Sequence, residues 1–430
     1  MQSPSNSTGE KDTLSSVQTQ EGRSNTHSSD LPSASNDPLA DGAVGTTSRP
    51  ATWLNALKEI LPIYIAVHLA FLVLTYLATL FAFTPKNFSL YSLPLSTLIK
   101  SWDRWDSGHF VEIATKGYDA PYRTAFFPLF PLLERALAFL THDPFVAGLV
   151  IANLAGLGML TVLYRLVAQD FDAVLAYRTV LYFSVFPTTF FFAAAYNESL
   201  FLCLALLSFY YMRRGNWWLA GLFGFLASLT RSVGLFLLVP FFYEYLRQHQ
   251  FKLRATRFDI LGSTGMPAGL GLFALYCYVR FGDLLAFSHA QGSWLRQLHG
   301  PWHGLLDSFL IITRRGILSF DTIHNVIDLS AGLLMLLLIV LCFIGPLKFS
   351  RDLRAYALYA ASIYFFTLLV PEAGGFPLAS LSRLVLELFP AFIVLAAIGK
   401  KPQFNLYYLT LSGAILAFML MQFLTGYWIV

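Results

Sequence analysis

Long apolar segments recur between residues 58 and 429, and they limit what this chain can fold into more than any other feature. A helix needs about 20 mostly apolar residues to cross the hydrocarbon core of a bilayer. About eleven segments qualify by composition, some of them short. They are residues 58–82, 146–168, 174–195, 198–213, 216–230, 232–246, 259–280, 326–346, 354–371, 384–399 and 405–429. The pattern predicts an all-α polytopic membrane protein with about eleven transmembrane helices.

The overall composition supports this class and argues against others. Of the 430 residues, 56% are hydrophobic and only 13% are charged, unlike the composition of a soluble globular protein. The net charge of +4 is small and no basic tract suits nucleic acid, so we expect no nucleic-acid partner. Cys203, Cys277 and Cys342 lie in apolar runs without the spacing of a zinc site or a disulfide framework. We therefore predict neither a metal site nor a cofactor.

The first 50 residues differ from the rest of the chain. They are rich in Ser, Thr, Asn, Asp and Gly and nearly lack aromatic residues. Such a segment cannot bury enough apolar surface to offset the entropy lost on ordering. We predict a disordered polar tail over residues 1–50 and a transmembrane domain over residues 51–430.

The segment 125–140 decides the orientation of everything that follows it. It is apolar but short, and Pro128 and Pro131 interrupt it, so it reads as a re-entrant or interfacial helix. If it does not cross and the N-terminus is cytoplasmic, nearly every short basic loop faces the cytoplasm. Counting it as a crossing would invert all later segments, so we favour the non-crossing arrangement. The long loops 83–145 and 281–325 then lie on the outer side.

Five polar features share that outer side in the favoured topology. They are the loop 83–124 with Asp106, the turn 196–199, the junction 230–232, the loop 281–325 and the loop 372–383 ending in Arg383. If the N-terminus were on the other side of the membrane, all of them would move together to the inner side. Their agreement predicts a single site at one face of the membrane.

The first of these features contains an acidic residue between aromatic ones, in the stretch Arg104-Trp105-Asp106-Ser107-Gly108-His109-Phe110. Downstream, apolar positions recur at helical spacing, which predicts a helix lying along the membrane interface with Asp106 near its start. Asp106 is then either an N-cap or a general base, with His109 one turn on to orient it or to contact a phosphate. Asp103 is a competing base, and spacing alone does not separate the two carboxylates.

The stretch 104–118, followed by Phe126-Phe127-Pro128 and Phe130-Pro131, closely resembles the first luminal loop of the second mannosyltransferase of GPI-anchor synthesis, the PIG-V type. Two further blocks, 193–201 and 229–234, are similar to segments of the same family. Val233 stands where the family usually has Asn. The resemblance is spread over about residues 80–240.

The resemblance implies a GT-C-like fold and a glycosyltransferase that uses a polyprenyl-phosphate sugar as donor. In such enzymes an acidic residue of the first outer loop deprotonates the acceptor hydroxyl, and the anomeric carbon is inverted. Carried over by position, Asp106 is the base, and His109 and Trp105 are candidates for contacts in the same pocket.

Several other residues are candidates for binding substrate. Arg231, joined by Arg383, would stabilise a phosphate leaving group, although each arginine could instead extend to lipid headgroups. Asn197 and Glu198 either cap a helix or belong to the site. Trp302 and His303, with His299 nearby, could bind an acceptor sugar or form an ordinary surface loop.

These observations predict an integral-membrane mannosyltransferase that acts at the outer or luminal face on a lipid-linked or glycan acceptor. The membrane would be the plasma membrane in a bacterium and the endoplasmic reticulum in a eukaryote. A transporter or flippase of lipid-linked sugars is the alternative, although the chain lacks the matching halves that transporters tend to show. A GT-C enzyme that uses another sugar is a further alternative, because pocket contacts and not the base select the sugar.

Overall fold

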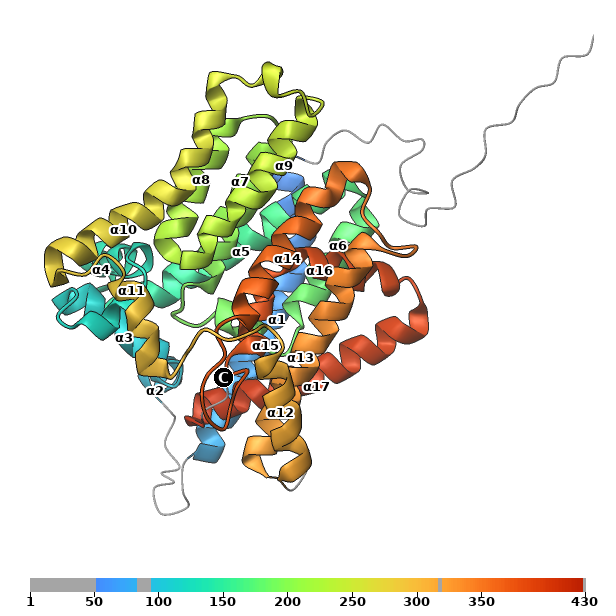
Figure 1. The fold of residues 1–430 in the computed structure, drawn as a ribbon. Helices are drawn as coiled ribbons and strands as arrows, with labels where there is room; N and C mark the ends of the chain where they lie inside the picture. Colours follow the sequence, from blue (N-terminus) through green and yellow to red (C-terminus); the bar gives the residue numbers. More distant parts are fainter. Residues whose placement is uncertain (1–51, 83–93, 316–318, 428–430) are drawn as a thin grey trace, which may run out of the picture. The chain divides into compact units, whose positions relative to one another are not determined.

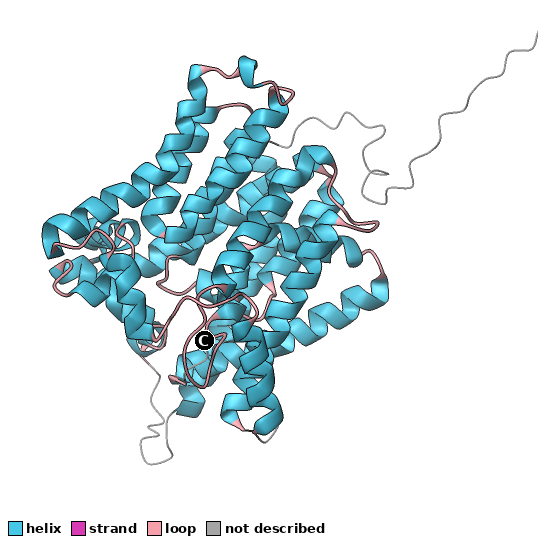
Figure 2. Ribbon diagram, in the orientation of Figure 1, coloured by secondary structure: helices cyan, strands magenta, loops and turns pink. Residues whose placement is uncertain are grey.

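A computed structural model of the chain describes residues 52–82, 94–315 and 319–427. All of these residues fall within one compact unit. Within these ranges the regular structure is helical, and extended pairing is limited to an isolated bridge between Arg296 and Glu372 (Figure 2). The prediction of an all-α protein is confirmed, whereas the predicted disordered tail, residues 1–50, lies outside the described residues.

The α-helices follow one another along the chain with short 3-10 segments between them (Figure 1). They are α1 (Trp53–Ala82), α2 (Leu95–Lys100), α3 (Asp106–Lys116), α4 (Leu129–Thr141), α5 (Pro144–Asp170), α6 (Ala173–Ser184), α7 (Glu198–Arg213), α8 (Trp217–Thr230), α9 (Leu238–Gln248), α10 (Gly265–Phe281), α11 (Ala286–His289), α12 (His303–Arg314), α13 (Phe320–Phe343), α14 (Arg354–Leu368), α15 (Leu381–Leu384), α16 (Phe389–Ile398) and α17 (Pro402–Thr425).

Five helical segments of the described chain are long and apolar enough to cross a membrane. They are α1, α5, residues Phe258–Phe281 ending in α10, Thr322–Phe343 within α13, and α17. A sixth would be the pair formed by Leu381–Glu387 and Phe389–Ile398, which bends by 89° at its break. The chain is therefore polytopic. Each of the eleven predicted segments contains helix, but the count of eleven crossings is not confirmed, because several of these helices are short or broken.

Prolines account for two of the breaks. Helix α6 ends at Ser184, and Pro187 separates it from the 3-10 helix η3 (Thr189–Phe192). Pro390 lies in the first turn of α16, directly after the 89° break. Proline lacks the backbone N–H of the helical ladder and disfavours helical geometry in the residue before it. At each break a proline therefore interrupts the regular helix.

The segment 125–140 forms α4, a helix of 13 residues that is not among the candidate spans. It packs against α3 and α5. This short helix agrees with the non-crossing arrangement predicted for the segment. The predicted helix after Asp106 is present as α3, and Asp106 is its first residue.

Glycines allow α8 to approach the segment that leads into α10. A Cβ atom added to Gly221 would overlap the backbone of Gly262, and one added to Gly265 would overlap the backbone of Gly221. Small residues matter at such contacts because lipid tails are as apolar as the side chains that they replace. The close packing fixes the position of α8, which ends beside the site described below.

Charged residues join the C-terminal end of α7 to neighbouring helices. Arg213, in the last turn of α7, lies 2.8 Å from Oδ2 of Asp170 and 3.0 Å from Oε1 of Glu244. Tyr356 donates a hydrogen bond to Asp170 as well. These bonds tie α5, α7, α9 and α14 together at one end, so that the first residues of α7 are held in place at the other.

Candidate functional site

A cavity of about 860 Å³ lies where all five of the predicted polar features meet. Each feature contributes at least one lining residue: Asp106, Asn197, Arg231, Arg296 and Arg383. They come from the start of α3, the start of α7, the end of α8, the loop after α10 and helix α15. The structure therefore brings together segments that are up to 277 residues apart in the chain.

Asp106 is held at the start of α3 by a tyrosine from a distant segment. The backbone N–H of Asp106 donates to Oη of Tyr196 at 3.2 Å, and the hydroxyl of Tyr196 donates to the carbonyl of Arg104 at 3.0 Å. Trp105, the N-cap residue, has a φ of +52°, which costs strain for a bulky side chain. Because Trp105 is the N-cap and no side chain caps the helix, Asp106 does not serve as the cap. Its carboxylate is free to face the cavity.

Asp103 differs from Asp106 in its surroundings. Its Oδ1 accepts a hydrogen bond from the hydroxyl of Ser107 at 2.9 Å, so its carboxylate turns back onto α3. Asp103 is not among the residues that line the cavity, whereas Asp106 is. The two carboxylates that spacing could not separate thus occupy different environments.

Ion pairs join Asp106 to residues of three other segments. Oδ2 of Asp106 accepts from Nη1 of Arg383 at 2.8 Å, and Nε of Arg383 lies 3.5 Å from Oε1 of Glu198. The same Glu198 oxygen lies 2.9 Å from Nη1 of Arg231, whose Nε lies 2.8 Å from Oε1 of Glu387. The result is a chain of alternating charges: Asp106, Arg383, Glu198, Arg231 and Glu387.

Asn197 and Glu198 begin α7 but do not cap it. Asn197 occupies the N-cap position without a side-chain cap bond. Its Oδ1 accepts from Arg231 at 2.9 Å, and its Nδ2 donates to the carbonyl of Thr230 at 2.9 Å. Both side chains are therefore committed to the arginine network and not to the helix terminus.

A cluster of aromatic rings lines another part of the cavity. His109 stacks on Phe126 with ring centroids 4.8 Å apart, and the ring of Trp294 lies edge-on at 6.1 Å. Trp105 also lines the cavity. Nδ1 of His109 is buried and has no hydrogen-bond partner among the described residues. Among the described residues, His109 and Asp106 form no hydrogen bond with each other, so the predicted orienting contact is not observed. Both residues nevertheless line the same cavity.

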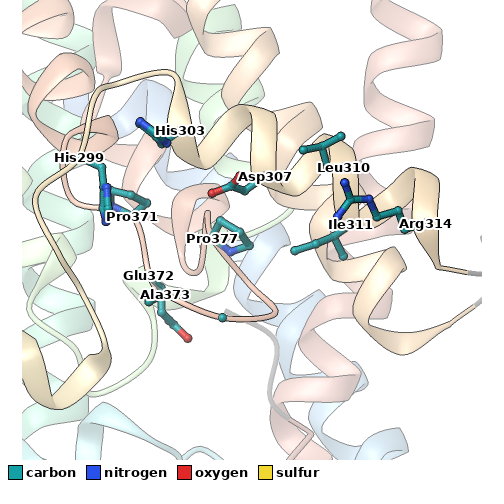
Figure 3. A pocket seen from close by; sticks show the side chains of 11 residues that line it. His299, His303, Asp307, Leu310, Ile311, Arg314, Pro371, Glu372, Ala373 and Pro377 are labelled. Carbon is teal, nitrogen blue, oxygen red and sulfur yellow. The ribbon is translucent and has the colours of Figure 1, made fainter.

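Trp302 and His303 lie apart from this cavity. His303 lines a second cavity of about 290 Å³ with His299, Asp307, Arg314 and residues of the 371–377 loop (Figure 3). Trp302 lines neither cavity, and 59% of its surface is exposed. Glu372 lines both cavities. The predicted pair therefore belongs to a neighbouring hollow and not to the group around Asp106.

Two backbone segments, residues 295–299 and 369–373, pair between the two cavities. Leu295 accepts from the N–H of Ala373 at 2.8 Å, and the N–H of His299 donates to the carbonyl of Leu369 at 2.9 Å. Arg296 and Glu372 lie opposite each other in this short antiparallel pair. Their backbones are fixed, which limits how far either side chain can move.

Sequence reasoning did not single out Arg296, Glu372 or Glu387. Glu387 follows Arg383 by one helical turn, a spacing that could have indicated its membership of the site. Arg296 and Glu372 carry no such signal, because each is an isolated charge in a polar loop. Within the described chain, no group of three or more His, Cys, Asp or Glu residues is arranged to hold a metal ion.

Glu134 is a buried carboxyl in α4, the helix that packs against α3. Neither of its oxygens has a hydrogen-bond partner in the described part of the chain, and a Cβ atom on Gly148 would overlap it. Burial raises the pKa of Glu134 to about 9, and the charge of Asp103 acts in the same direction. We therefore expect Glu134 to be protonated at neutral pH.

Glu134 makes stability fall as the pH rises. Between pH 4.5 and about pH 9 the folded protein holds a proton that the unfolded chain has lost. The contribution of Glu134 to the free energy of unfolding is largest below that range, decreases as the pH rises through it, and is constant above it. Thermal unfolding in detergent across the range is expected to show this decline in wild type and a flatter profile in Glu134→Gln. The same slope in both proteins would contradict the assignment.

The fold and the site together define a polytopic α-helical membrane protein with a cavity lined by arginines and carboxylates. Residues 88–282 match the family model described as Mannosyltransferase (PIG-V). This match confirms the resemblance found in the sequence motifs. It covers the start of α3, the start of α7 and the end of α8, but not Arg296 or Arg383.

Curated relatives show the same similarity. GPI alpha-1,6-mannosyltransferase 2 of Rattus norvegicus is 32% identical over 154 residues, covering 33% of this chain and 31% of the relative. The Homo sapiens protein of that name is 31% identical over 211 residues, covering 43% and 42%. GPI mannosyltransferase 2 of Schizosaccharomyces pombe is 31% identical over 146 residues, covering 33% and 31%. The chain thus matches less than half the length of each of these relatives.

Two solved structures show a weaker likeness. ArnT from Cupriavidus metallidurans bound to undecaprenyl phosphate is 15% identical with a TM-score of 0.47, over 73% of this chain and 60% of that one. The Archaeoglobus fulgidus oligosaccharyltransferase tethered to an acceptor peptide is 10% identical with a TM-score of 0.38, over 84% and 55%.

Proposed function

We propose that this protein is an integral-membrane mannosyltransferase. It transfers mannose from a polyprenyl-phosphate donor to a hydroxyl of a lipid-linked or glycan acceptor. The match of residues 88–282 to the PIG-V family supports the reaction class. The observation that carries the proposal is that Asp106, in the motif of that family, faces the 860 Å³ cavity beside Arg383.

In the proposed reaction, Asp106 is the general base. Its carboxylate takes the proton of the acceptor hydroxyl while the hydroxyl oxygen attacks the anomeric carbon of the donor. The bond between that carbon and the phosphate oxygen breaks, and the phosphate leaves with the electron pair. Attack from the face opposite the phosphate inverts the anomeric carbon.

Arg383 and Arg231 supply positive charge where the phosphate leaves. Arg383 already contacts Asp106 at 2.8 Å, so a donor phosphate competes with Asp106 for this guanidinium. Release of Asp106 from Arg383 makes the carboxylate more available as a base. Asn197 and Glu198 act by positioning the two arginines.

The aromatic side of the cavity is proposed to bind the apolar and ring-shaped parts of the substrates. Trp105 and His109 line the cavity and offer ring faces on which a sugar can stack. His303 and Trp302 lie at or beside the second cavity, which is proposed to contact the more distant part of the acceptor.

The proposed location is an integral membrane position with the site at the outer or luminal face. This is the plasma membrane in a bacterium and the endoplasmic reticulum in a eukaryote. The basic residues Arg213, Arg247 and Arg351 gather at the end of the helices opposite the site, which supports this orientation.

A transfer assay tests the proposal. Purified wild-type protein in detergent is supplied with radiolabelled polyprenyl-phosphate mannose and a membrane lipid extract, and we expect label to appear in an acceptor. Polyprenyl-phosphate glucose and arabinose serve as matched donors to test the sugar. Absence of transfer from all three donors, with movement of these lipids across vesicle membranes, would favour a transporter instead.

A further inference from the structure

The arginines that line the larger cavity differ in their ion pairing. Arg231 and Arg383 each lie within 4.0 Å of two carboxylates, in the chain of charges described above. Arg296 has no carboxylate within that distance among the described residues. Its Nη2 donates to the carbonyl oxygen of Ala379 at 3.1 Å. The positive charge of Arg296 is therefore the least neutralised of those facing the cavity.

The surroundings of Arg296 make this charge costly. Burial lowers the pKa of Arg296, and repulsion by Arg383 and Arg231 acts in the same direction, whereas Glu372 and Asp106 oppose it. Arg296 is half-buried and lines the cavity without a close carboxylate, and an arginine in such a position is often used to bind an anionic ligand. The influence of Asp106 also places Arg296 within electrostatic reach of the proposed base.

Glu372 is a weak counter-charge for Arg296. It lies opposite Arg296 in the backbone pairing and lines both cavities. Burial raises the pKa of Glu372, which favours its neutral form, and Arg296 only partly opposes this effect. The region around Arg296 consequently favours an incoming anion.

The position of Arg296 is fixed by its backbone. The bridge to Glu372 and the bond from the N–H of Gln297 to the carbonyl of Pro371, 3.2 Å long, hold the extended segment in place. Arg296 and Leu298 alternate along this segment, and both line the larger cavity. A guanidinium on such a support loses little further freedom when it binds a ligand.

We infer that Arg296 binds the phosphate group of the polyprenyl-phosphate donor in the larger cavity. The inference rests on the proposed function and identifies a residue outside the segment that matches the family model. A planar guanidinium suits two oxygens of a phosphate. As the bond to the anomeric carbon breaks, the phosphate gains negative charge and Arg296 stabilises it, while the acceptor proton goes to Asp106.

Direct binding tests this role without the need for sugar transfer. Radiolabelled polyprenyl monophosphate and the uncharged polyprenol are titrated onto purified wild type, Arg296→Gln, Arg296→Lys and Arg254→Gln in detergent. Arg254 is the matched control because it is an exposed arginine that lines neither cavity. We expect Arg296→Gln to lower the affinity for the phosphate lipid by about tenfold or more and to leave polyprenol binding unchanged. Arg296→Lys should lie between Gln and wild type, and Arg254→Gln should match wild type.

The inference is overturned if Arg296→Gln binds the phosphate lipid as tightly as wild type, or if it loses polyprenol equally. If Arg296→Gln does not fold, Arg296→Lys decides, since it keeps the charge and loses the planar fork; wild-type affinity would then overturn the inference. Wild type that binds the phosphate lipid but transfers no sugar would refute the proposed function alone. Wild type that binds neither lipid would refute both.

Discussion

Replacement of Asp106 by Asn is expected to lower the rate of mannose transfer by roughly 10²–10⁴-fold. The change keeps the size of the side chain but removes the group that accepts the acceptor proton. Asn can still accept a hydrogen bond from Arg383, so the ion-pair chain loses one charge without losing its geometry. The measurement is the initial rate of transfer from radiolabelled polyprenyl-phosphate mannose at saturating donor and acceptor.

Asp103→Asn is the matched control for this prediction. Asp103 lies three residues away, turns back onto Ser107 and does not line the cavity. Its replacement should leave the rate within a few fold of wild type. A large loss in Asp103→Asn together with a normal rate in Asp106→Asn would assign the base to Asp103, and the thermal stability of both variants shows whether either loss reflects misfolding.

Replacement of Glu198 by Gln is expected to destabilise the folded protein by about 2–3 kcal/mol, because Arg231 and Arg383 each lose a charge-assisted contact but keep a second carboxylate. Glu198 is 2% exposed, and one of its oxygens lies beside both Arg231 and Arg383. Without this carboxylate, two cavity arginines repel each other with only Glu387 and Asp106 to balance them. The free energy of unfolding is measured by denaturant titration in mixed micelles.

Glu112→Gln provides the comparison. Glu112 also pairs with an arginine, Arg123, but 42% of the Glu112 side chain is exposed, and the buried Arg123 keeps Asp119 as a second partner. An ion pair with an exposed carboxylate contributes about 0–1 kcal/mol, and the loss in Glu112→Gln should be of that order. Equal losses in Glu198→Gln and Glu112→Gln would show that the chain of charges is not important for stability.

Some features of the site could be predicted because they are local in sequence. The helix after Asp106 follows from the spacing of Phe110, Ile113 and Ala114. The second and third of these buried residues follow the first by three and four positions, which places all of them on one helix face. Arg231 and Arg383 were candidates because a phosphate leaving group needs positive charge at the membrane surface. Arg296 had no such signal, because a single arginine in a polar loop is ordinarily a surface residue.

Helix lengths were less predictable than helix positions. Hydropathy located the long apolar helices, but it did not show that α6 ends at Ser184 or that the chain bends by 89° before α16. Proline marks both breaks in the sequence, yet a proline such as Pro62 lies within α1, which continues past it. Whether a proline ends a helix depends on which neighbouring groups can satisfy the freed backbone.

The sequence by itself determined that this is an all-α protein with several membrane-crossing helices, because a bilayer requires long apolar segments whose backbone bonds are satisfied internally. It also determined the family resemblance, through motifs that are contiguous in the chain. Only the tertiary structure decided which charges meet. Asp106 and Arg383 lie 277 residues apart and are joined at 2.8 Å, a contact that depends on the packing of several helices and on no local pattern.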